Sequence, residues 1–224
     1  MNILILAAHA DDEVLGCGGT IARWVREGHR VSVLFFTDGV GSRGRATATV
    51  KARQQGARKA AKILGFSIVG FGKFPDNQLD RVSLLELAQT IERAKASVAP
   101  ERVLTHFWGD LNIDHRRVFE AALTAFRPQP GERCRQILSF EVASATEWGS
   151  PASAFRPTCY VQVSTEDMER ATEAYEAYVH EVRPSPHSRS VDAFRARRIV
   201  RGSEVGVPCA EGFVLCRQIE DLPS

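Results

Sequence analysis

The chain has 224 residues, of which 44% are hydrophobic and 25% are charged, values that are ordinary for a globular protein. This length lets one domain bury a full core without disulfides or a structural metal, so we expect a single domain over residues 1–224. The formal net charge is +2, and the basic run "RARRIVR" at residues 195–201 spreads its arginines around a helix, which predicts a solvated helix and no nucleic-acid partner.

The five cysteines are far apart and form no CxxC pair; they occupy positions 17, 134, 159, 209 and 216. This pattern argues against both a disulfide framework and a thiolate zinc site, so we expect reduced thiols in the core. The N-terminal apolar run is too short for a signal peptide, and no segment approaches the length of a membrane span. We therefore expect a cytoplasmic protein without a membrane span.

Strand-like and helical patterns alternate along the chain. The expected strands cover residues 3–8, 30–37, 67–72, 103–107 and 137–142, and the expected helices cover residues 21–27, 49–64, 84–96 and 115–126. After a loop rich in Ser, Ala and Pro, we expect a strand at 160–163, a helix at 166–182 and a strand at 212–217. The alternation predicts an α/β fold: a Rossmann-like, mostly parallel sheet with helices on both faces, in three α/β/α layers.

Polar clusters follow the predicted strands where each strand ends. His9, Asp11 and Asp12 follow the first strand, and Thr37 and Asp38 close the second. Residues 74–80, 106–115 and 141–148 follow the next three strands. Since the carboxyl ends of parallel strands meet at one edge of a sheet, these clusters are expected on one rim, where such sheets bind ligands.

The stretch "HADDE" at residues 9–13 offers ligands for a metal ion. His9 and Asp12 lie three residues apart on a turn into a helix, so both side chains can face one point, and His115 is the natural third donor from a neighbouring loop. Three such ligands with an open position for water are typical of catalytic zinc, and Asp11 remains as a base. On the alternative interpretation, His9 is a hydrogen-bonded rim residue, Asp11 or Asp12 caps the helix beyond, Asp114 caps its own helix and His115 is exposed.

Further stretches carry motifs of the same kind. They are "AAHADDEVLGCGGT" at 7–20, "KARQQGARKAAKILG" at 51–65, "FPDNQLD" at 74–80, "GDLNIDHRRVFEA" at 109–121 and "VPCAEGFVL" at 207–215. Together they resemble the PIG-L (LmbE-like) zinc-dependent de-N-acetylases, whose first motif usually reads AHPDDE and whose second has an Asp-His pair opening a helix. The resemblance covers nearly the whole chain.

This resemblance implies a function and a set of site residues. It implies that His9, Asp12 and His115 bind Zn²⁺, or another divalent metal, and that Asp11 is the general base. Arg53 and Asp76 match positions that contact the sugar substrate. The implied reaction is hydrolysis of the N-acetyl group of an amino sugar, free or carried on a nucleotide, lipid or aglycone. The implied partner is thus a small molecule, and a homo-oligomer is compatible with the sequence.

The chain departs from the family pattern in three places. Ala10 replaces the usual Pro, and Gln55 and Gly56 stand where the helix usually carries Glu. At the second motif many relatives read HPDH and use the first His in the transition state, whereas this chain has Asn112. Asparagine can donate a hydrogen bond to an oxyanion but cannot deliver a proton.

The missing acid has three candidates in the sequence. His187 in "RPSPHSRS" is one, and His106 on the fourth strand end is a second, although a buried structural role is as good an interpretation for it. Asp11 is the third, if it both accepts and returns the proton. In the loop after the fifth strand, Glu147 and Trp148 are expected to bind substrate, since they offer a hydrogen-bonding group and a flat apolar face for a sugar ring.

Two other functions compete with this interpretation. The "GCGG" stretch at residues 16–19 allows a Rossmann-type nucleotide-binding enzyme such as a methyltransferase or dehydrogenase. Its spacing is not GxGxxG, and the preceding carboxylates would repel a pyrophosphate. A non-catalytic binding module on the same fold is the second alternative, but all expected ligands and the base are present.

Overall fold

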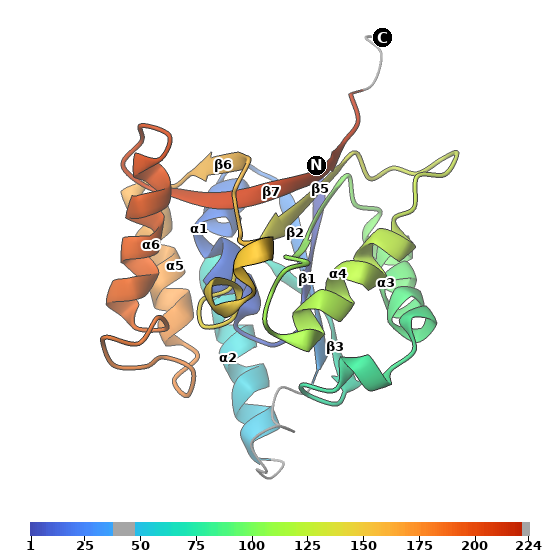
Figure 1. The fold of residues 1–224 in the computed structure, drawn as a ribbon, viewed down its shortest axis with the longest axis horizontal. Coiled ribbons are helices and arrows are strands. Elements are labelled where there is room, and N and C mark those ends of the chain that lie inside the picture. Colours follow the sequence, from blue (N-terminus) through green and yellow to red (C-terminus); the bar gives the residue numbers. More distant parts are fainter. Residues whose placement is uncertain (38–47, 221–224) are drawn as a thin grey trace.

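Figure 1 shows the fold of the chain in a computed structural model, which describes residues 1–37 and 48–220. Asp38, expected at the end of the second strand, lies outside the described residues. Within them, one seven-stranded sheet has the order β3-β2-β1-β4-β5-β7-β6. Its strands are β1 Asn2–Ala7, β2 Arg30–Thr37, β3 Ser67–Phe74, β4 Arg102–His106, β5 Gln136–Phe140, β6 Cys159–Gln162 and β7 Ala210–Gln218.

The strands β1 to β5 pair in parallel, and β7 pairs antiparallel with both β5 and β6. Helices cover both faces of the sheet (Figure 1). On one side lie α1 Asp12–Arg26, α2 Ala48–Leu64, α5 Thr165–Glu176 and α6 Val191–Ser203; on the other lie α3 Leu84–Val98 and α4 Ile113–Ala125. The predicted three-layer, mostly parallel α/β/α fold is therefore confirmed.

Each face of the sheet has its own apolar core. One core joins β1, α1, α2 and α5, and the other joins β1, α3 and α4. The strand β1 is buried along nearly its whole length because it contributes to both cores, which explains its continuous run of Ile and Leu. It lies between β2 and β4, where the strand order reverses, so the rim at its carboxyl end is the ligand-binding position of this topology.

Several predicted helix limits are wrong. The helix expected at 21–27 begins at Asp12, nine residues earlier, and the helix expected at 166–182 ends at Glu176. Three glycines in the first half of α1 lower its intrinsic helix propensity, which hides its start. The five cysteines are all free, as expected, but only Cys17 and Cys134 are buried. In the described part of the chain, every helix is too short or too polar to cross a bilayer.

A break inside α1 is closed by a buried carboxylate from β7. Cys17 has non-helical φ and ψ angles of −150° and 26°, so the turn after it lacks its usual backbone partners. Glu211 supplies them, because its Oε1 accepts the Gly19 N–H at 3.0 Å and its Oε2 accepts the Thr20 N–H at 2.7 Å. The carboxylate thereby acts as an N-cap in the middle of the helix.

The other side of the break is satisfied by Arg198. Its Nη2 donates to the carbonyl oxygens of Val14 and Leu15, both at 3.2 Å, and its Nε donates to Glu211 Oε1 at 2.8 Å. Arg198 and Glu211 side chains are each 3% exposed. The expectation of a wholly solvated helix at 195–201 is therefore wrong at Arg198, which points into the core and fastens α6 to α1.

We expect Arg198→Met to destabilise the protein strongly. Removing the guanidinium leaves the Glu211 charge buried without its cation, which costs about 3–5 kcal/mol for a buried pair. The free energy of unfolding from denaturant titration measures this. Arg195→Met, on the exposed face of the same helix, is the matched control and should change it by less than about 0.5 kcal/mol. Equal stability of the two variants would contradict the assignment.

Candidate metal centre

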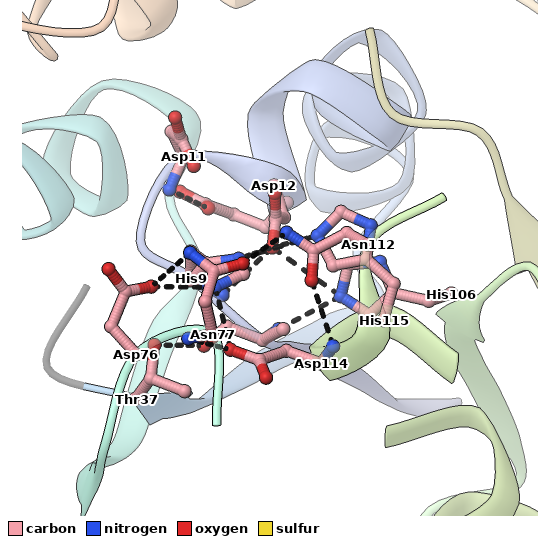
Figure 2. A network of polar contacts seen from close by, with 12 residues as sticks. His9, Asp11, Asp12, Thr37, Asp76, Asn77, His106, Asn112, Asp114 and His115 are labelled. Atoms are coloured by element: carbon pink, nitrogen blue, oxygen red, sulfur yellow. Dashed lines mark hydrogen bonds and ion pairs between the residues drawn. The ribbon is translucent and has the colours of Figure 1, made fainter. Parts of the chain in front are cut away.

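Three side chains from β1, α1 and α4 converge at the carboxyl end of β1 (Figure 2). His9 follows β1, Asp12 begins α1, and His115 lies in the first turn of α4. The His9 Nδ1 lies 3.2 Å from Asp12 Oδ2 and 3.3 Å from His115 Nε2, and the third side of the triangle measures 3.4 Å. All three residues are buried. The interpretation of His115 as an exposed residue is therefore wrong.

The spacing of these atoms fits a tetrahedral metal ion. Ligands about 2.0–2.1 Å from a tetrahedral zinc lie about 3.3–3.4 Å from one another. The three measured separations agree with that edge length. In addition, Asp12 Oδ1 is buried and has no hydrogen-bond partner among the described residues. A buried carboxylate oxygen without a donor is the type of atom that a cation would satisfy.

The outer nitrogen of each histidine faces a carboxylate. His9 Nε2 lies 3.1 Å from both Asp76 Oδ1 and Asp114 Oδ2, and His115 Nδ1 lies 3.1 Å from Asp110 Oδ2. Such partners fix the tautomer and the ring orientation of metal-binding histidines. They direct His9 Nδ1 and His115 Nε2 toward the centre of the triangle.

Asp114 supports His9 from a fixed position. Its carboxylate accepts the backbone N–H groups of Asn77 at 2.7 Å and Leu79 at 2.9 Å, which joins α4 to the loop after β3. The N-cap of α4 is Asn112, whose side chain accepts the Asp114 N–H. The interpretation of Asp114 as a cap is therefore wrong, and the carboxylate serves the histidine instead.

Asp11 adopts an unusual backbone conformation beside the triangle. Its φ is 139° and its ψ is −23°, a combination that costs about 1–3 kcal/mol in a residue with a side chain. Its N–H donates to Glu13 Oε2 at 3.1 Å. Burial raises the pKa of Asp11 to about 6, although Arg189 and Arg53 oppose that shift. A carboxylate with a pKa in this range is suited to act as a general base near neutral pH.

His106 lies against the triangle without being a ligand. Its Nε2 accepts the Ala8 N–H at 2.8 Å, and its ring stacks on His115 with centroids 3.9 Å apart. Burial, together with the neighbouring His115, holds the pKa of His106 well below its usual value. A neutral, fully buried imidazole with this acceptor role is a structural residue, so His106 is not a suitable acid.

The other predicted acid and oxyanion groups lie on the rim. Asn112 Nδ2 donates to Asn77 Oδ1 at 3.2 Å, while its oxygen caps α4. His187 is exposed, accepts the Arg189 N–H through Nδ1 at 3.0 Å and packs edge-on against Trp148. Each keeps a hydrogen that these contacts do not use: the second Nδ2 hydrogen of Asn112, and the Nε2 hydrogen of His187.

The predicted substrate residues are already engaged with the protein to different degrees. Arg53 is buried and donates through Nε to Glu181 Oε1 at 3.1 Å. The Glu147 carboxylate accepts the Ser144 N–H at 2.8 Å and pairs with Arg197, so it shapes its own loop. Trp148, in contrast, is 54% exposed.

Several residues of the cluster carry no signal in the sequence. Arg189 and Glu181 lie in the segment after α5, far along the chain from the residues they contact. Tyr178 donates to the Glu13 carboxylate, and Thr146 donates to Asp110 Oδ2 at 2.6 Å. Asp110, which faces His115 Nδ1, is the exception. It could have been predicted, because it is a carboxylate in the loop that precedes His115.

The fold and the cluster define an α/β/α protein with a candidate metal centre at its switch point. The family model PIG-L, described as GlcNAc-PI de-N-acetylase, matches residues 4–126. The chain is 30% identical over 170 residues to the uncharacterized deacetylase YaiS of Escherichia coli (strain K12), covering 74% of this chain and 83% of that protein. The chain therefore belongs to the PIG-L family.

The chain is also similar to two proteins that are named for different reactions. Over 128 residues the chain is 36% identical to 4-oxalmesaconate hydratase of Pseudomonas putida, covering 51% of this chain and 47% of that protein. The solved N,N'-diacetylchitobiose deacetylase of Pyrococcus horikoshii shares the fold, with a TM-score of 0.77 at 20% identity over 96% of this chain and 83% of that one. Proteins similar to this chain are thus named for two different reactions.

We expect His115→Ala to abolish tight metal binding. The wild type should bind one divalent metal per chain, and loss of one of three ligands should leave a substoichiometric content after dialysis. Elemental analysis measures the content, and His180→Ala, at an exposed position, is the control that should keep it. Stoichiometric metal in His115→Ala would refute the ligand set.

Proposed function

We propose that the protein is a metal-dependent amide hydrolase that removes the N-acetyl group from an amino sugar or from its glycoside or nucleotide conjugate. The observation that carries the proposal is the triangle of His9, Asp12 and His115, next to which Asp11 stands in the chain as a buried carboxyl group. Membership of a de-N-acetylase family and the similarity to a bacterial deacetylase support the reaction type. Zn²⁺ is the metal that best suits two imidazoles and one carboxylate.

The residues of the chain have distinct parts in this reaction. A divalent metal held by the triangle would lower the pKa of water and polarise the amide carbonyl. Asp11 takes the proton as the water oxygen bonds to the carbonyl carbon. A hydrogen of Asn112 Nδ2 stabilises the oxyanion. When the C–N bond breaks, the nitrogen receives a proton from Asp11 or from His187, and acetate and a free amine result.

Substrate recognition is proposed for the residues around this centre. Arg53 lies on α2, Asp76 lies in the loop after β3, and both are buried. Trp148 offers an exposed ring against which a sugar can stack, and Glu147 holds the loop that carries it. We expect the substrate to be a sugar. An exposed aromatic ring can stack on the apolar face of a sugar, and buried charged side chains can hydrogen-bond to its hydroxyl groups.

Hydration of a carbon–carbon double bond is the second candidate. The similarity to 4-oxalmesaconate hydratase favours it, and hydration also begins with removal of a proton from water by a base. The two reactions differ in their products. An acetate-release screen over free, glycosidic and nucleotide-linked N-acetylhexosamines tests the first, and loss of enoate absorbance tests the second. Absence of acetate from all N-acetyl substrates with a metal-replete enzyme would refute the deacetylase proposal.

We expect Asp11→Asn to retain the metal and lose most of the turnover. An amide cannot accept the proton of water, and loss of a general base lowers kcat about 10²–10⁴-fold. Steady-state acetate release together with elemental analysis checks both parts. Near-wild-type kcat in a metal-replete variant would exclude Asp11 as the base.

Arg53→Met is expected to weaken substrate binding without release of metal. The guanidinium is not a ligand, so its loss should raise KM by about tenfold, equivalent to roughly 1.4 kcal/mol of binding. The specificity constant on the best substrate measures the effect, and Arg58→Met on the same helix serves as a control. An unchanged specificity constant would remove Arg53 from the substrate site.

A further inference from the structure

The side chain of Asp11 is held by an arginine from a distant segment. Arg189 Nη1 donates to Asp11 Oδ2 at 2.9 Å, across a sequence separation of 178 residues. The other oxygen, Asp11 Oδ1, is buried and has no hydrogen-bond partner among the described residues. The two oxygens of this carboxylate are thus unequal: Oδ2 accepts a hydrogen bond from Arg189, and Oδ1 accepts none from the described residues.

Arg189 is itself held in place on every side. Its Nη1 also donates to Glu181 Oε2 at 3.1 Å, and its Nε donates to Ser144 Oγ at 2.6 Å. Its carbonyl oxygen accepts the Tyr175 hydroxyl at 2.6 Å, and its side chain is only 15% exposed. A guanidinium with its position determined in this way can orient a carboxylate rather than follow it.

We propose that Arg189 is a positioning residue, which fixes Asp11 through Oδ2 and leaves Oδ1 as the oxygen that accepts the proton of water. In the step, the O–H bond of water breaks, an Oδ1–H bond forms and the electron pair stays on the water oxygen that attacks. This inference rests on the proposed function for its chemistry, but the contact itself does not depend on the substrate.

The backbone of Asp11 supports the same assignment. A residue with φ of 139° persists only where its surroundings determine its conformation. Here the N–H is held by Glu13 Oε2, the carbonyl oxygen accepts the N–H groups of Val14 and Leu15, and the carboxylate is held by Arg189. Without the arginine, the carboxylate could turn about its terminal bond and exchange its oxygens, and a small misplacement of a reacting group lowers the rate severely.

Kinetics of Arg189→Met test the positioning role. We expect kcat to fall about 10²-fold, KM to change by less than about threefold and metal content to stay at one per chain. Arg189→Lys should recover part of kcat, since an ammonium can still reach Oδ2. Arg195→Met, exposed on α6, is the matched control. A kcat within twofold of wild type, or a loss confined to KM, would overturn the proposal.

A thermal unfolding measurement, which needs no substrate, tests this inference separately from the proposed function. On metal-free protein, Arg189→Met should lower Tm by about 5 °C or more, because it leaves the Asp11 charge buried without its cation. In the background of Asp11→Asn, the same substitution should cost less than half of that shift. Equal shifts in both backgrounds would overturn the contact, whichever reaction the enzyme catalyses. If the Tm shift is clearly smaller in the Asp11→Asn background but no acetate is released, only the proposed function is rejected.

Discussion

Buried negative charge at the carboxyl end of the sheet is the constraint on which the rest of the structure depends. In the described part of this rim, six carboxylates are at most 3% exposed: Asp11, Asp12, Glu13, Asp76, Asp110 and Asp114. A carboxylate withdrawn from water destabilises the fold unless a cation or several donors surround it. Distant segments supply most of these partners, among them two backbone amides for Asp114 and the Tyr178 hydroxyl for Glu13. Among the described residues, Asp12 has imidazoles and the His9 N–H around it, so this carboxylate is where the candidate centre offers a place to a cation.

The same constraint explains why α1 is broken. Its first turns must present Asp12 at the rim, while its second half packs in the core under β1. The break at Cys17 lets the two halves of the helix meet these two requirements separately. It exposes backbone donors and acceptors in the interior, and one buried ion pair satisfies both sets, since Glu211 accepts and Arg198 donates. The C-terminal motif around Glu211 therefore acts on the site through the helix that carries a ligand, although it lies on β7.

Local signals predicted which three side chains form the candidate metal centre, whereas contacts between distant segments escaped prediction. His9 and Asp12 share one turn, and the rule that strand ends of a parallel sheet meet brings in His115. The strand pattern was equally readable, because buried parallel strands are continuous apolar runs. Arg189 had no comparable signal: it lies in an irregular segment, and its contact spans 178 residues. Gly56 shows how a departure from a motif becomes clear only in three dimensions, since a Cβ there would lie 2.8 Å from the Tyr178 ring.

Solved structures named as a deacetylase and as a hydratase share this fold, so the fold alone does not decide the reaction. Both reactions begin when water gives a proton to a base, and both require the proton to be returned later. Asn112 stands where the resemblance implies a histidine in many relatives, and it is a helix cap that cannot titrate. In the proposed reaction the proton is returned by Asp11 or by His187, and Asp11 can return it only through an oxygen that stays in place. Asp11 meets this condition because Arg189 holds Oδ2 and leaves Oδ1 in place throughout. With Asp11 in both roles, Asn112 and Arg189 would be two parts of one arrangement, in which a single oxygen of Asp11 both accepts and returns the proton.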